Sequence, residues 1–284
     1  MTRVATYLSF VRVSHTVFAL PFALTGALLA ARLHPVGWRE VGWILACMVA
    51  ARSAAMGFNR LVDRKWDALN PRTAMRELPR GAMTVREATL FVIVWSAAFV
   101  AAAFQLNPLC GWLSPVALAI VFWYSLAKRY TTYTQAFLGL AMAVAPVGGW
   151  LAAGGAFVAP EPWLLALAIG LWVGGFDVLY ACQDLDFDRA QGLRSVPATF
   201  GVERSLWISR AMHVATVACM AALAALVPLG PIYLGGVALV AALLVYEQSL
   251  VSAQDLSRVK QAFDLNGYVG ILYFLATAAA LYVR

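Results

Sequence analysis

Nine apolar segments dominate the sequence and leave little room for a soluble fold. Each is long enough, or nearly so, to cross a bilayer, for which a helix needs about 20 residues. Only 12% of the residues are charged and 62% are hydrophobic, whereas a soluble domain carries roughly 25% charged residues. We therefore predict an all-α integral membrane protein with about nine transmembrane helices. The approximate segments are 16–33, 41–58, 87–106, 109–127, 135–153, 163–180, 206–227, 231–250 and 266–282.

The positive charges fall on one side of these segments. If the N-terminus lies in the cytoplasm, the cytoplasmic connections hold 17 of the 21 lysines and arginines. Cytoplasmic loops of membrane proteins carry such an excess, so we expect a multi-pass protein of the cell inner (plasma) membrane in this orientation. The net charge of +7 then reflects topology, and nucleic acid is not expected as a partner.

Two polar stretches close apolar segments at their cytoplasmic ends. The first runs from Asn59 to Asp67 with Asp63 midway, so that an amide and two carboxylates recur every four residues. The second runs from Asp177 to Asp188, about 120 residues later. Its four-residue step joins Tyr180, Asp184 and Asp188. Residues at this spacing lie along one face of a helix. These stretches hold six of the eight aspartates, which is the strongest functional signal in the chain.

The two stretches have matching internal spacings. Asn59 and Tyr180 are 121 residues apart, as are Asp63 and Asp184. This weak internal repeat predicts two four-helix halves around a central cavity, each with a polar stretch on its second helix. No change of composition marks a domain boundary, so we expect a single transmembrane domain over residues 1–284.

The paired carboxylates are typical of a divalent-cation site. Carboxylates at the end of a membrane helix cost free energy unless they are solvated, paired or bound to metal. A solvated helix cap would explain one or two aspartates, but not two pairs in separate helices. Mg²⁺ takes oxygen ligands and commonly joins carboxylates to substrate phosphates. We predict one ion at Asp63 and Asp67 and another, across a cleft, at Asp184 and Asp188. Asp186 points about 160° away from this stripe and is expected to be solvated.

A phosphate-bearing substrate also requires cationic ligands. Many lysines and arginines lie on the cytoplasmic side, and some of them serve topology alone. Those that follow closely on a motif or end a helix are expected to bind a diphosphate. They are Arg72, Arg76, Lys128, Arg129 and Arg194.

Arg52 lies inside an apolar segment, seven residues before Asn59 and on the same helical stripe. An arginine within a membrane span indicates function by default. We expect it to line a polar pocket for a second substrate. The alternative is structural pairing with a buried polar group or a helix carbonyl.

With these residues the chain resembles the UbiA superfamily of intramembrane aromatic prenyltransferases over essentially its whole length. The first family signature is an Arg seven residues before Asn-x-x-x-Asp-x-x-x-Asp. The second is Asp-x-x-Tyr-Ala-x-Gln-Asp followed by another Asp. The matching residues are Arg52, Asn59, Asp63 and Asp67, and then Asp177, Tyr180, Gln183, Asp184 and Asp188. Shorter family segments are matched at 76–81, 124–129 and 192–195.

Some positions depart from the family pattern. Arg60 stands where many members continue Asn with Asp, and Glu77 stands where members of the ubiquinone branch often have Pro. The opening segment 14–22 is more similar to the UbiA-like branch linked to the futalosine route of menaquinone synthesis. The acceptor implied by the resemblance is therefore either 4-hydroxybenzoate or a dihydroxynaphthoate-type acid.

The resemblance implies Mg²⁺-dependent transfer of an isoprenyl group from a polyprenyl diphosphate to a ring carbon of a small aromatic acceptor, with release of diphosphate. The reaction would serve ubiquinone or menaquinone biosynthesis, with the lipid tail open to membrane lipid. Aromatic side chains would shield the allylic cation, and an ionised phenol, Asp177 or Asp184 would help to remove the ring proton. The resemblance adds Asn59 to the metal ligands, and it implies substrate contacts for Arg52, Asn59, Tyr124, Tyr180 and Gln183.

Two other classes fit parts of the pattern. CDP-alcohol phosphotransferases also use paired aspartates, but their Asp-Gly-x-x-Ala-Arg opening is absent from this sequence. A cation- or proton-coupled transporter could use the aspartate clusters, yet such carboxylates are expected near the membrane midplane rather than at one face.

Overall fold

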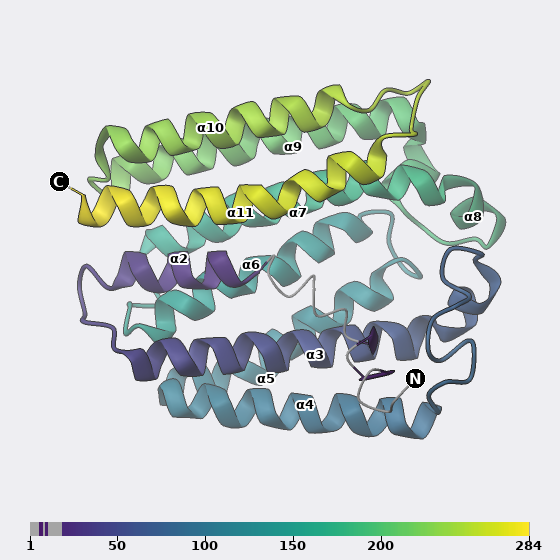
Figure 1. Cartoon of the computed structure of the whole chain (residues 1–284), viewed down its shortest axis with the longest axis horizontal. Coiled ribbons are helices and arrows are strands. Elements are labelled where there is room, and N and C mark those ends of the chain that lie inside the picture. The colour runs from purple at the N-terminus through teal and green to yellow at the C-terminus, as the bar shows by residue number, and fades with distance from the viewer. Residues whose placement is uncertain (1–5, 8, 11–18, 284) are drawn as a thin grey trace. The chain divides into compact units, whose positions relative to one another are not determined.

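The computed structural model describes residues 6–7, 9–10 and 19–283, and this part of the chain is helical with no strand (Figure 1). The all-α prediction is confirmed. The helices are α2 (Leu20–Ala30), α3 (Trp38–Leu69), α4 (Val85–Leu106), α5 (Pro108–Ala127), α6 (Thr134–Ala152), α7 (Pro160–Ala181), η2 (Cys182–Asp184), α8 (Leu185–Ala190), α9 (Val196–Leu226), α10 (Gly230–Ser249) and α11 (Val259–Tyr282).

Within the described residues, eight helical segments are long and apolar enough to cross a membrane. They correspond to the second to ninth apolar segments of the sequence. The first predicted segment, 16–33, is represented by the shorter α2, and its residues 16–18 lie outside the described part. The composition therefore locates the spans, although α3 extends well past the expected end at residue 58.

Local sequence signals set the helix ends. Thr84 begins α4 with a capping box, in which its hydroxyl accepts from the amide of Glu87 at 3.2 Å and the Glu87 carboxylate accepts from the Thr84 amide at 2.8 Å. Ser195 caps α9 in the same way by accepting from the amide of Ala198 at 3.2 Å. Such caps satisfy amides that lack a partner in the first turn. They fix where the loops after the two polar stretches end.

The packing divides the chain into two compact units of unequal size. The first unit contains α3, α4 and α5, and the second contains α2 and α6 to α11. In the first unit α4 packs along α3, and in the second α7 packs against both α6 and α9 (Figure 1). This division does not follow the two four-helix halves that the internal repeat predicts, because the first apolar helix packs with the second unit.

Close backbone contact explains why α2 belongs to the second unit. A Cβ placed on Gly149 of α6 would lie 1.8 Å from the carbonyl oxygen of Ala23, and one placed on Gly26 of α2 would lie 2.0 Å from that of Pro146. Only glycine permits this approach. In membranes, helices associate through such small-residue contacts because lipid leaves little hydrophobic force between them.

Gly149→Ala is expected to lower the free energy of unfolding by about 1–3 kcal/mol, since the added methyl group meets backbone and overpacks the α2–α6 contact. Gly148 is the matched control, because it lies on the same helix with nothing within 4 Å of its Cβ position. Thermal unfolding of the purified protein in detergent compares the two variants. Equal midpoints for Gly148→Ala and Gly149→Ala would contradict the close contact.

A buried polar chain joins three helices of the second unit. The indole nitrogen of Trp172 on α7 donates to the Asn266 side-chain oxygen on α11 at 2.7 Å. The Asn266 amide nitrogen donates to a Glu247 carboxyl oxygen on α10 at 3.0 Å. All three side chains are buried, where an unsatisfied polar group would be costly. These two hydrogen bonds therefore fix the relative placement of α7, α10 and α11.

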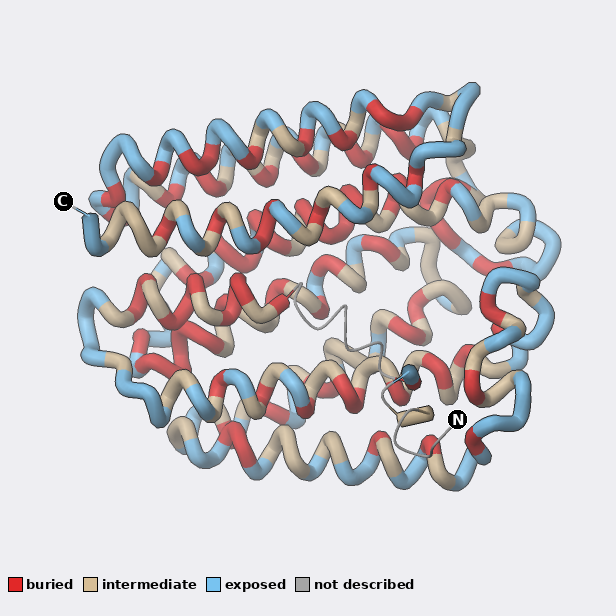
Figure 2. Tube along the Cα trace, in the orientation of Figure 1, coloured by how far each residue is buried: buried red, intermediate tan, exposed pale blue. Residues whose placement is uncertain are grey.

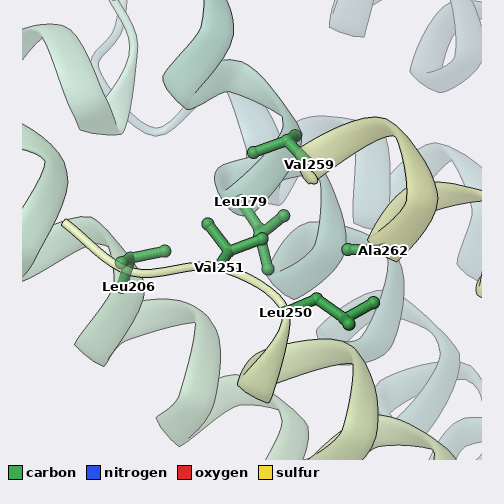
Figure 3. Packing of buried hydrophobic residues seen from close by; sticks show 6 residues of the cluster. All are labelled: Leu179, Leu206, Leu250, Val251, Val259 and Ala262. Carbon is green, nitrogen blue, oxygen red and sulfur yellow. The ribbon is translucent and has the colours of Figure 1, made fainter. Parts of the chain in front are cut away.

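An apolar cluster packs around the end of α7 (Figure 3). Leu179 of α7 lies among residues from α9, from α11 and from the loop that follows α10. The other buried members are Leu206, Leu250, Val251, Val259 and Ala262. Tyr180 packs against this cluster. The end of α7, where the second polar stretch begins, is therefore held in place by apolar packing.

Candidate active site

The first polar stretch lies on a single continuous helix. Buried residues recur along α3 at helical spacing from Ile44 to Asp67, and this buried side includes Asp63, which is only 3% exposed (Figure 2). The side-chain nitrogen of Asn59 lies 3.3 Å from an Asp63 carboxylate oxygen. The four-residue spacing in the sequence therefore becomes direct contact between side chains.

Asn59 also contacts α5. Its side-chain nitrogen lies 3.3 Å from the hydroxyl oxygen of Ser125, which is buried. Ser125 was not among the residues predicted for the site, although it directly follows Tyr124 in the matched segment 124–129. Its position as a polar residue within the apolar segment 109–127 could have indicated it.

Asp67 is held by the loop that follows α3. A terminal nitrogen of Arg76 lies 2.8 Å from each of the two Asp67 carboxylate oxygens. The Thr73 hydroxyl donates to the backbone carbonyl of Asp67 at 3.1 Å. The structure thus brings Arg76 onto Asp67, whereas Arg72 is exposed at the start of the same loop. Cationic and anionic ligand groups lie side by side at this end of α3.

Arg52 lies about two turns before Asn59 on α3, and its side chain is partly buried. Its Nε atom is buried and has no hydrogen-bond partner among the described residues. The half-buried Tyr124 of α5 lies near the Arg52 guanidinium. An arginine with an unsatisfied buried donor in a membrane span is suited to an anionic ligand group.

The second polar stretch departs from the predicted geometry. We expected one continuous helix through Asp188, but α7 ends at Ala181 and a 3-10 turn, η2, precedes the short α8. A 3-10 turn has three residues per turn rather than 3.6, so it changes the direction of the side chains after it. Asp184 closes η2 and Asp188 lies on α8. The four-residue step from Tyr180 to Asp188 therefore does not form one straight stripe.

The acidic residues of this stretch still have defined surroundings. An Asp188 oxygen accepts from the hydroxyl of Ser195 at 2.9 Å, which joins α8 to the N-cap residue of α9. Asp177 lies near Asp184. Asp186 is exposed, in keeping with the prediction of a solvated neighbour. Gln183 is also exposed, and its side chain donates to the carbonyl of Tyr180 at 3.2 Å.

The structure brings together two of the predicted cationic segments in the second unit. The Arg194 amide donates to the carbonyl of Lys128 at 2.8 Å, and its guanidinium donates to the carbonyl of Tyr130 at 2.8 Å. The loop after the second polar stretch is thereby joined to the turn that contains Lys128 and Arg129. These three cations form one basic region of the second unit.

The donor atoms at the polar stretches suit a hard cation. They are carboxylate and amide oxygens, which Mg²⁺ prefers. In the described ranges no three side chains of His, Cys, Asp or Glu form a group that could hold a metal ion. Mg²⁺ in proteins usually binds one or two carboxylates and takes the rest of its ligands from phosphate and water.

Comparisons with known proteins agree with this arrangement. Residues 19–277 match the model of the UbiA prenyltransferase family. The chain is 37% identical to a 4-hydroxybenzoate octaprenyltransferase of Citrobacter koseri, over 83% of this chain and 82% of that protein. It is 36% identical to the protein of the same description from Salmonella paratyphi C, with the same coverage.

Solved structures give the same assignment. A UbiA homologue from Aeropyrum pernix K1, solved in its apo form, is 39% identical with a TM-score of 0.85, covering 95% of this chain and 98% of that one. A UbiA homologue from Archaeoglobus fulgidus bound to DMAPP and Mg²⁺ shares the fold with a TM-score of 0.73 at 22% identity, covering 98% and 100%. The chain belongs to the UbiA prenyltransferase family.

Proposed function

We propose that this protein transfers an isoprenyl group from a polyprenyl diphosphate to a ring carbon of a small aromatic acid, with Mg²⁺ as cofactor and release of diphosphate. The observation that carries the proposal is the pair of acidic stretches at the ends of α3 and α7, each with cationic residues beside it. Family membership and the relatives described as 4-hydroxybenzoate octaprenyltransferases support it. A single domain over residues 1–284 stays a prediction, supported by one family match over 19–277.

The acidic residues would hold the cofactor and the leaving group. Asp63 and Asp67, with Asn59, would bind one Mg²⁺, and Asp184 and Asp188 would bind another. When bound, the metal neutralises the diphosphate and stabilises its departure. At the second stretch Asp177 lies near Asp184, and a cation beside two carboxylates would stabilise their charged forms.

The cationic residues would orient the diphosphate. Arg76 contacts both oxygens of Asp67 with one nitrogen, so a diphosphate bound near Asp67 would meet a guanidinium already in place. Guanidinium groups form strong charge-assisted bonds to phosphate oxygens. The other proposed diphosphate ligands are Arg72, Lys128, Arg129 and Arg194.

The remaining site residues would serve the organic groups. Tyr124 and Tyr180 would shield the allylic carbon as positive charge develops on it, and Gln183 would contact substrate. The acceptor ring carbon forms the new bond as the bond from the allylic carbon to the diphosphate oxygen breaks. The ring proton then leaves with help from an ionised phenol, Asp177 or Asp184.

The acceptor is proposed to carry a carboxylate that binds Arg52. Arg52→Met is expected to lower kcat/KM for the aromatic acid about 100-fold, because a charge-assisted hydrogen bond contributes about 1.5–3 kcal/mol. The KM for geranyl diphosphate should change less than about twofold. Arg39→Met is the control on the same helix, since the Arg39 side chain is 66% exposed. Equal losses for both substrates would contradict this assignment of Arg52.

The acceptor itself is tested by direct comparison. Purified protein in lipid nanodiscs is given Mg²⁺ and radiolabelled geranyl diphosphate, with 4-hydroxybenzoate and 1,4-dihydroxy-6-naphthoate in parallel. Extractable prenylated product with either acid supports the proposed reaction class. The faster acid indicates whether the enzyme serves ubiquinone or menaquinone synthesis.

Membrane placement forms part of the proposal. The eight apolar helical segments support a multi-pass protein, and the charge asymmetry of the sequence supports an inner-membrane location with the acidic stretches facing the cytoplasm. Lipid would supply the polyprenyl diphosphate and accept the product laterally. A cation- or proton-coupled transporter is the competing function, and ion uptake into proteoliposomes without prenylated product would favour it.

A further inference from the structure

Two positions at which the sequence departs from the family pattern contact each other. Arg60 on α3 forms an ion pair with Glu77 in the loop after α3, although the two residues are 17 positions apart. Each residue is only 4% exposed. Arg60 and Glu77 therefore form a buried ion pair within the first unit.

The pair also holds the chain near the N-terminus. The hydroxyl of Ser9 donates to the second carboxylate oxygen of Glu77 at 2.6 Å. A nitrogen of Arg60 approaches the Ser9 carbonyl at 3.5 Å, and the Arg60 guanidinium lies 5.5 Å from the centre of the Phe10 ring. We call Ser9, Phe10, Arg60 and Glu77 the latch; Ser9 is exposed, and the other three residues are buried.

Apolar side chains surround one side of the latch. Phe10 forms a cluster with Met83 and Ala88, against which Leu61 and Leu78 pack. An ion pair in such surroundings loses much hydration, and replacing it by apolar residues is often neutral for stability. Its main contribution is therefore geometric, because the two carboxylate oxygens of Glu77 are each fixed by a separate donor.

The latch is joined to the candidate active site by the peptide bond between Arg76 and Glu77. Glu77 follows Arg76, which contacts Asp67. The backbone carbonyl of Glu77 also accepts from the amides of Ala82 and Met83 at 2.9 and 3.2 Å, which closes the loop before α4. The contacts of Glu77 therefore determine the backbone path of the loop both before and after this residue.

We infer that Arg60, Glu77 and Ser9 are positioning residues that hold the 70–83 loop so that Arg76 stays beside Asp67 for diphosphate binding. They act through Arg76 and touch neither substrate nor metal. The inference deepens the proposed function and rests on it for its kinetic test, whereas its structural test is independent of activity.

The experiment uses Glu77→Gln in lipid nanodiscs, with hydrogen exchange of the loop amides and steady-state kinetics as two readouts. Gln keeps the size of the side chain but removes the charge that Arg60 and Ser9 both contact. We expect amides in 71–83 to exchange at least about tenfold faster. With Mg²⁺, the KM for geranyl diphosphate should rise about tenfold, while the KM for the aromatic acid changes less than about twofold.

Two further variants separate positioning from general stability. Asp264→Asn removes the acid of the exposed Lys260–Asp264 pair on α11 and should change neither readout. The double variant Arg60→Met/Glu77→Leu leaves no unpaired buried charge, so its unfolding midpoint should return towards that of the wild type while fast exchange and the raised KM persist.

Unchanged loop exchange and unchanged KM in Glu77→Gln would overturn the inference. Recovery of both readouts in the double variant would also overturn it, because the buried charge alone would then explain the single variant. If the wild type makes no product, the proposed function fails, yet the exchange measurement still decides whether the latch orders the loop.

Discussion

Asp63→Asn is expected to lower the rate of prenyl transfer about a thousandfold while the protein stays folded. Asn preserves the shape of the side chain, and its oxygen can still accept from Asn59, now 3.3 Å from the Asp63 carboxylate. It removes the negative charge that the proposed metal requires. A thousandfold loss corresponds to about 4 kcal/mol of barrier, which is within the several kcal/mol that a metal ion contributes.

The measurement is kcat/KM for geranyl diphosphate across a Mg²⁺ titration, with a thermal unfolding curve for each protein. Asp264→Asn is the control, because it makes the same chemical change at an exposed site on α11. Asp63→Asn should need more Mg²⁺ for its residual rate. Activity above about a tenth of the wild type at every Mg²⁺ concentration would contradict a metal role for Asp63.

Asp184→Asn is expected to cause a loss of similar size through the second acidic stretch. Asp184 closes η2 and lies near Asp177, so a cation bound there would lie beside more than one carboxyl group. Removing one charge should weaken Mg²⁺ and diphosphate binding together. We expect product formation to fall about a thousandfold, a barrier increase of about 4 kcal/mol.

The matched control is Asp186→Asn, two residues further along the chain. Asp186 is exposed, and its replacement should leave the rate within about twofold of the wild type. Both variants lose one negative charge, and the two positions lie in nearly the same stretch of sequence. Equal effects of the two substitutions would mean that net charge, rather than a specific ligand, governs the reaction at this stretch.

Much of the fold follows from the sequence because membrane helices are constrained by length and apolarity. Eight of the predicted spans correspond to helical segments in the structure. The division of the chain was less predictable. The contact of Gly149 with Ala23 places α2 in the second unit, and residue spacing alone cannot reveal which helices approach backbone to backbone.

The site was predictable where helical periodicity governs it. Asn59 and Asp63 are in contact because α3 is unbroken. Beyond Ala181 periodicity fails, since the turn at Cys182–Asp184 has a different rise and rotation. Ser125 and the Arg60–Glu77 pair depend on contacts between distant segments. The sequence indicated Arg60 and Glu77 as departures from a pattern, but not that they pair.

The two acidic stretches are proposed to support Mg²⁺-dependent prenyl transfer. The most direct measurement gives the protein in lipid nanodiscs radiolabelled geranyl diphosphate and 4-hydroxybenzoate or 1,4-dihydroxy-6-naphthoate, with Mg²⁺ or with EDTA. We expect prenylated product and an equal amount of released diphosphate with Mg²⁺, and neither with EDTA. Product formation at the same rate in EDTA, or no product with either acid from folded protein, would contradict it.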